Sequence, residues 1–206
     1  MDLEANAVQP IFIDGPAGRL FALYHPPTSA RRDGCDVIYV PPFAEEMNRS
    51  RRMAALQARA LAAAGIGVLA LDLFGTGDSA GDFGEARWEI WREDVVAAGD
   101  WLAARSGRPL ALLGLRLGAL LAAEVAARQP DRFRRLVLWQ PVVEGKTMLT
   151  QFLRVQLAAA MTANGNRETT ETLRATLAAG RPVEIAGYEL APELAAAIDA
   201  ARCAAC

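Results

Sequence analysis

The residues best placed to support chemistry lie in residues 110–128, LALLGLRLGALLAAEVAAR. Gly114 and Gly118 flank Arg116 at the spacing of G-x-S-x-G, the sharp strand-to-helix turn that presents a nucleophilic serine. Glycines are needed there because a Cβ would collide with the neighbouring strand and helix. The central residue here is Arg116, whose guanidinium stays protonated and has no lone pair with which to attack a carbonyl carbon. The spacing therefore predicts the turn but not its usual nucleophile.

A second stretch, residues 77–81, matches G-x-S-x-G to the letter as GDSAG. The nucleophile turn requires a strand immediately before it and a helix immediately after it. Here a glycine-rich loop precedes the motif and Asp-Phe-Gly follows it. We therefore expect Ser79 to be a turn serine that hydrogen-bonds nearby backbone.

A serine nucleophile also needs an imidazole to take its proton and a carboxylate to orient that imidazole. The chain has a single histidine, His25, which precedes the Pro26-Pro27 turn. The simplest interpretation of His25 is a partly exposed structural residue. The residues given therefore contain no conventional Ser-His-Asp triad.

Apolar periodicity predicts alternating strands and helices. The expected strands are residues 8–14, 19–24, 36–40, 68–73, 109–113 and 135–139. The expected helices are residues 51–64, 88–102, 117–128, 146–162, 167–179 and 191–202, and residues 183–190 form a strand or an extended arm. In the first helix, apolar residues recur at helical spacing at Met53, Leu56, Ala60, Leu61 and Ala64.

The strand–helix alternation after residue 36 predicts a three-layer α/β/α fold with a mostly parallel sheet. The first two strands, joined by Gly15-Pro-Ala-Gly18, predict an N-terminal antiparallel hairpin. We expect one domain over residues 1–206, with residues 146–190 as a helical cap or insertion within it. Ligands of such sheets bind at the carboxyl ends of the strands.

Composition excludes several classes of partner. The net charge of −2 gives no electrostatic case for nucleic acid or an anionic membrane. No apolar run reaches the roughly 18 residues that a membrane span needs. The N-terminus lacks an apolar signal core, and the three cysteines are an odd number, so we expect a cytoplasmic protein without a disulfide framework. The Cys203-Ala-Ala-Cys206 pattern fits a redox or a prenylation motif, although a frayed tail is the simpler interpretation.

Three segments together resemble the α/β-hydrolase superfamily: VIYVPPFAEE after the hairpin, DLFGTGDS at residues 72–79, and the GLRLG turn. More narrowly, PPFAEEMNRSRRM with GLRLGALLAAE resembles the exosortase-A-system-associated hydrolases of type 2. Those are bacterial proteins linked to exopolysaccharide and protein-sorting loci. The resemblance covers roughly residues 8–144 and supplies no substrate.

The resemblance implies an anion-binding arrangement around Arg116. The N–H of Leu117 opens a helix, and an N–H near Phe43 or Ala44 should face it, as in an oxyanion hole. Glu45 and Glu46, expected in the loop after the third strand, are close enough in this fold to pair with Arg116.

The resemblance also implies an acidic residue after the sixth strand and a histidine after an eighth strand. Glu144 is the candidate for the acid position, although a solvated loop carboxylate explains it equally simply. His25 should lie at the opposite edge of the sheet.

Two hypotheses follow. The first is an ester or acyl hydrolase in which Glu45 or Glu46 acts on a water molecule. The second is a catalytically inactive hydrolase-fold protein that binds a small anionic metabolite or a protein partner. Neither requires a metal or cofactor, and both are compatible with a homo-oligomer.

Overall fold

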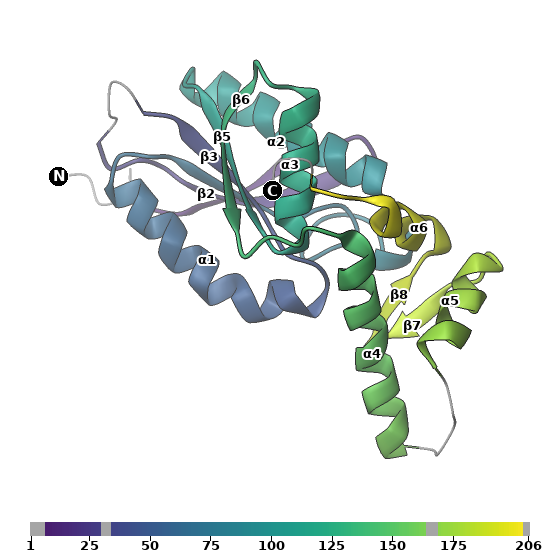
Figure 1. The fold of residues 1–206 in the computed structure, drawn as a ribbon. Coiled ribbons are helices and arrows are strands. Elements are labelled where there is room, and N and C mark those ends of the chain that lie inside the picture. Colours follow the sequence, from purple (N-terminus) through teal and green to yellow (C-terminus); the bar gives the residue numbers. More distant parts are fainter. Residues whose placement is uncertain (1–6, 30–33, 164–168, 204–206) are drawn as a thin grey trace.

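A mixed six-stranded sheet forms the centre of the molecule (Figure 1). The computed structural model describes residues 7–29, 34–163 and 169–203. The strands are β1 (Gln9–Asp14), β2 (Arg19–His25), β3 (Asp36–Val40), β4 (Val68–Leu71), β5 (Leu110–Leu115) and β6 (Phe133–Trp139), in the spatial order β1-β2-β4-β3-β5-β6. Strands β1 and β2 pair antiparallel, as do β2 and β4, and the remaining pairs are parallel. The predicted fold class is confirmed.

Helices cover both faces of this sheet. The helices of the described ranges are α1 (Glu45–Ala63), α2 (Trp88–Ser106), α3 (Leu117–Arg128), α4 (Gly145–Ala163), α5 (Thr170–Ala178) and α6 (Pro192–Ala200), with a short 3₁₀ turn η1 (Phe83–Glu85). Helix α1 packs on one face, and α2 and α3 pack on the other. No helix in the described ranges combines the length and apolarity that crossing a membrane requires.

Strand β3 shows how the sequence produces these layers. All five of its residues are buried, as expected for a central parallel strand with both faces covered. Val37 and Tyr39 pack toward α1, whereas Ile38 and Val40 pack toward α2 and α3. A continuous apolar run is therefore needed here rather than an alternating one.

Helix α1 corrects the sequence prediction in two ways. It begins at Glu45, six residues earlier than expected, because Glu45 and Glu46 occupy the first turn, where carboxylates interact favourably with the helix dipole. The apolar residues that show helical spacing also do not coincide with its buried face. Met53 and Leu56 are 53% and 46% exposed, whereas Met47, Ala58 and Ala62 are buried.

The C-terminal part forms a smaller cluster beside the sheet (Figure 1). Strands β7 (Val183–Ile185) and β8 (Tyr188–Leu190) pair as a separate antiparallel hairpin, which resolves the strand-or-arm alternative. Strand β7 packs against α4 and α5, β8 packs against η1, and α6 packs against α4 and α5. Residues 202–203 are not frayed, because Arg202 forms a bridge with Glu144 and the Cys203 N–H donates to the Val143 carbonyl at 2.9 Å. Cys206 lies outside the described residues.

A buried ion pair fastens the amino ends of the parallel strands. The Arg108 guanidinium donates to Asp36 Oδ1 at 2.6 Å, and the same oxygen accepts the Gly67 N–H at 2.8 Å. The Asp36 side chain is fully buried, and that of Arg108 is 14% exposed. One carboxylate therefore joins the starts of β3, β4 and β5.

Replacing this carboxylate should be costly. Asp36→Asn removes the negative charge that offsets buried Arg108, so we expect the free energy of unfolding in urea to fall by about 3–5 kcal/mol. The matched control is Asp100→Asn, because Asp100 pairs with Arg132 through a side chain that is 73% exposed. That change should cost less than about 1 kcal/mol. Equal losses in the two variants would contradict this assignment.

Candidate functional site

The turn between β5 and α3 has the predicted strand-to-helix geometry. Strand β5 ends at Leu115, α3 begins at Leu117, and Arg116 between them has φ 55° and ψ −117°. Its N–H donates to the Trp139 carbonyl at 3.1 Å, which ties the turn to the end of β6. Such a backbone conformation is rare for a non-glycine residue, and positions of this kind cluster at functional sites.

Both flanking glycines are required by close backbone packing. A Cβ on Gly118 would lie 2.2 Å from the Pro41 carbonyl oxygen and 2.5 Å from that of Val40. A Cβ on Gly114 would lie 2.4 Å from the Ala119 Cα. The start of α3 therefore sits directly against the end of β3, which is the arrangement of a nucleophile elbow.

The Arg116 side chain contacts two different helices. Its Nε donates to Glu46 Oε1 at 3.3 Å, from the first turn of α1. Its Nη2 reaches Gln151 Oε1 at 3.5 Å and Met148 Sδ at 3.9 Å, both on α4. The side chains of Arg116 and Glu46 are 32% and 37% exposed. The guanidinium thus links α1 to α4 across the elbow.

Glu45, the other candidate partner, takes part in a different network. Its Oε2 accepts from Asn48 Nδ2 at 3.2 Å and from the Tyr188 hydroxyl at 3.4 Å. Burial, with Glu45 adding to it, raises the pKa of Tyr188. Glu45 therefore holds the β7–β8 hairpin against α1. Tyr188 lies far away in sequence and carried no signal for this role.

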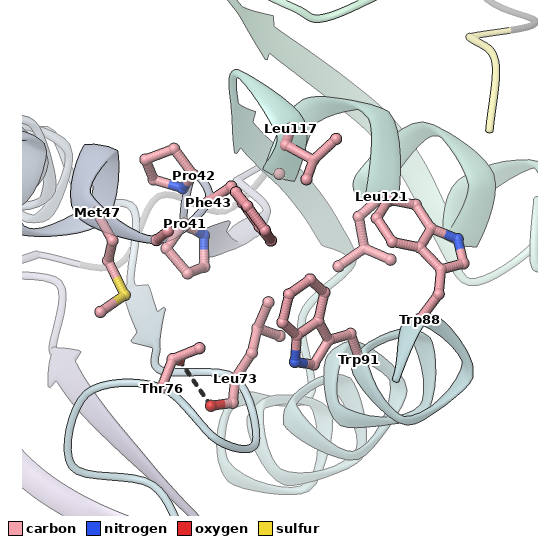
Figure 2. A pocket seen from close by; sticks show the side chains of 12 residues that line it. Pro41, Pro42, Phe43, Met47, Leu73, Thr76, Trp88, Trp91, Leu117 and Leu121 are labelled. Atoms are coloured by element: carbon pink, nitrogen blue, oxygen red, sulfur yellow. Dashed lines mark hydrogen bonds between the residues drawn. The ribbon is translucent and has the colours of Figure 1, made fainter. Parts of the chain in front are cut away.

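The predicted oxyanion residues do come together. Ala44, the residue before α1, has φ 49°, so α1 and α3 both start at sharp turns. The first N–H groups of a helix have no acceptor within that helix. Phe43, Ala44 and Leu117 line one narrow crevice with Trp88 and Trp91 (Figure 2). Its free volume is about 10 Å³, enough for at most one water molecule.

A larger cavity opens between α1 and α4. Its volume is about 250 Å³, and it is bordered by Phe43, Glu46, Met148, Phe152 and five further residues. Phe43 and Phe152 meet edge-to-face with ring centroids 4.9 Å apart. Glu46, Met148 and Gln151 each touch Arg116, so this cavity adjoins the elbow cation.

Ser79 is a structural turn serine, as expected. Its hydroxyl donates to the Asp72 carbonyl at 2.6 Å and accepts the Phe21 N–H at 2.8 Å. The first bond closes the loop after β4 on itself, and the second attaches that loop to the neighbouring strand β2. The hydroxyl is therefore committed to backbone groups and has no imidazole beside it.

His25 and Glu144 both lie apart from Arg116. His25 pairs with Val68 at the start of β4, at the opposite edge of the sheet from the elbow. It is only 5% exposed, so the expectation of partial exposure was wrong. Desolvation, with a contribution from Arg59, lowers its pKa. Glu144 forms an exposed ion pair with Arg202 at 3.3 Å, in agreement with a solvated loop carboxylate.

Asp94 was not singled out from the sequence, yet it positions the loop below the crevice. It lies on α2, is fully buried, and accepts the Phe74 N–H on Oδ2 at 2.8 Å. Trp91 Nε1 donates to the Phe74 carbonyl at 2.9 Å. Side chains of α2 therefore bind both the backbone N–H and the backbone carbonyl of Phe74. Burial raises the pKa of Asp94 to about 7. Across the described ranges, no group of three or more His, Cys, Asp or Glu side chains is arranged to hold a metal ion.

Residues 37–200 match the family described as serine aminopeptidase, S33, and the chain belongs to this family of α/β-hydrolases. No curated protein matches the chain.

Several solved structures share the fold. XC6422 from Xanthomonas campestris, an α/β serine hydrolase without a lid, is 24% identical over 64% of this chain and 60% of its own, with a TM-score of 0.55. Hypothetical protein PA2218 from Pseudomonas aeruginosa is 15% identical over 100% of this chain and 75% of its own, with a TM-score of 0.65.

Est1E from Butyrivibrio proteoclasticus, solved with ferulic acid, is 20% identical over 93% of this chain and 71% of its own, with a TM-score of 0.63. The chain spans 60% of XC6422 and 61% of an α/β serine hydrolase homologue from Coxiella burnetii. At these identities, the likeness shows the fold alone.

The buried Asp94 predicts an unusual pH dependence of stability. In the folded protein Asp94 keeps its proton up to about pH 7, whereas the unfolded chain releases it near pH 4. Between those values the folded state binds more protons, so the free energy of unfolding should fall as the pH rises, by up to about 4 kcal/mol. Urea unfolding from pH 5 to pH 8 measures this slope. Asp94→Asn should flatten it, and an unchanged slope in that variant would contradict the assignment.

Proposed function

We propose that this chain is a ligand-binding member of the hydrolase family that does not use serine chemistry. The observation that carries the proposal is Arg116 at the centre of the elbow, in an ion pair with Glu46. A guanidinium cannot act as a nucleophile, since it stays protonated and has no available lone pair. The elbow geometry is kept, but the group at its centre is a fixed positive charge.

The surrounding residues support the same proposal. The single histidine of the sequence, His25, lies at the opposite edge of the sheet. Ser79 is held by two backbone hydrogen bonds. Glu46 would be the base for a carboxylate-assisted attack by water, and its Oε1 is already paired with Arg116. Hydrolysis of an ester or acyl substrate by Glu46 is therefore the second hypothesis, suggested by the family and opposed by this pairing.

The ligand we propose is a small acyl or anionic metabolite in the cavity between α1 and α4. Phe43, Phe152 and Val155 offer apolar walls for its body. Nε of Arg116 donates to Glu46 and Nη2 contacts Gln151 and Met148, so the two N–H groups of Nη1 remain for an anionic head. In this proposal, residues 146–190 act as a cap over the elbow.

The narrower assignment to the exosortase-associated type is part of the same proposal. It is supported by PPFAEEMNRSRRM and GLRLGALLAAE, the two segments that contain Glu46 and Arg116. In that case the anion site would be a feature of the exosortase-associated hydrolases. The protein would act in the cytoplasm, and its gene would be linked to an exopolysaccharide locus.

Activity measurements separate the two hypotheses. We expect no labelling by a fluorophosphonate probe and background turnover of a short-chain nitrophenyl ester, because loss of triad members typically costs about 10⁴–10⁶ in rate. Arg116→Ser should not restore turnover, since no imidazole is in reach to accept the proton. Ser79→Ala is the matched control. Turnover in the wild-type protein that Ser79→Ala or Glu46→Gln abolishes would overturn the proposal.

A further inference from the structure

A further cavity lies beneath α1, on the face of the sheet that α1 covers. Its volume is about 190 Å³, and it runs between α1 and strands β2, β3 and β4. The sheet register places Leu23, Ala70 and Tyr39 side by side as its floor. Phe21 and Asp72 lie toward the carboxyl edge of this floor, and His25 lies toward the amino edge. We call this cavity the α1 groove.

Small side chains keep the α1 groove open. Ala54 and Ala55 face it from α1, and Ala70 faces it from β4 between the larger Leu23 and Tyr39. Protein interiors normally pack at high density with few voids larger than a water molecule. A gap of this size holds about six water-sized groups, which suits a short-chain organic molecule.

A charged pair marks the carboxyl-edge end of the groove. Arg51 Nη2 donates to Asp72 Oδ2 at 3.1 Å, and the same oxygen accepts the Asp78 N–H at 3.1 Å. Within the described part of the chain, this is the one hydrogen bond found for Arg51, whose side chain is 41% exposed. Several of its five donors therefore remain for a ligand.

The other end of the groove carries His25, four residues further along the strands. Phe21 and His25 are therefore about 13 Å apart along β2, at roughly 3.3 Å per residue. Desolvation and the nearby Arg59 lower the pKa of His25, so its imidazole is neutral at pH 7. Asp72 is balanced by Arg51, and Arg59 adds a positive charge beside His25. A cationic side chain therefore lies near each end of the groove.

We propose that the α1 groove binds a small monocarboxylate, with its carboxylate on Arg51 and its apolar body over Ala70 toward His25. The groove lies on the α1 face of the sheet, whereas Arg116 contacts the cavity between α1 and α4. This site is thus separate from the one assigned above and does not depend on it.

The single histidine makes the proposal directly measurable. In full-length protein labelled with ¹³C at histidine Cε1, His25 gives one imidazole signal. Titration with hexanoate should shift this signal saturably, and hexanol should need an at least tenfold higher concentration for half of the shift. The absence of a saturable shift with hexanoate, or equal responses to the two compounds, would overturn the proposal.

Variants locate the binding. Ala70→Leu should abolish the hexanoate response by filling the groove, and Ala55→Leu serves the same purpose if the first variant does not fold. Ala60→Leu, on the exposed face of α1, is the matched control and should respond like wild type. Arg116→Leu should also respond like wild type. A hexanoate response that survives filling of the groove, or that disappears with Arg116→Leu, would contradict this location.

Discussion

A close approach between two backbones holds the site together. At Gly118 the first turn of α3 lies against the carbonyl groups that end β3, leaving no room for a Cβ. This contact fixes the residue before α3 in a sharp turn and brings the N-terminus of α3 beside that of α1. The narrow crevice, the cavity between α1 and α4 and the position of Arg116 all follow from this approach.

Arg116 changes what this geometry can do. Two helix N-termini converge at the elbow, and both carry partial positive charge. A permanent cation placed there requires a negative partner, and Glu46 supplies it from the first turn of α1. Because the guanidinium also reaches Met148 and Gln151, Arg116 helps to hold α4 over the elbow. The fold of a hydrolase is thereby compatible with binding without serine chemistry.

The parts predicted from sequence were those with strong local signals. Apolar runs identified β3 and α3, and the glycine spacing identified the elbow. Apolar spacing did not mark the buried face of α1, because alanines face the sheet while the larger Met53 and Leu56 face solvent. Which of Glu45 and Glu46 pairs with Arg116 depends on the direction in which each side chain leaves the first turn of α1. The sequence analysis expected both residues in a loop and could not supply that direction. Asp94 acts through a contact between α2 and the loop after β4, which local patterns do not encode.

Arg116 and Glu46 form an ion pair at the elbow, and a double-mutant cycle measures the coupling energy between them. Arg116→Leu, Glu46→Leu and the double variant would be compared by urea unfolding. Because both side chains are about one-third exposed, we expect a favourable coupling of about 0.5–1 kcal/mol. The double variant should then be more stable than the sum of the single losses predicts. Strictly additive losses would show that the two side chains do not stabilise each other.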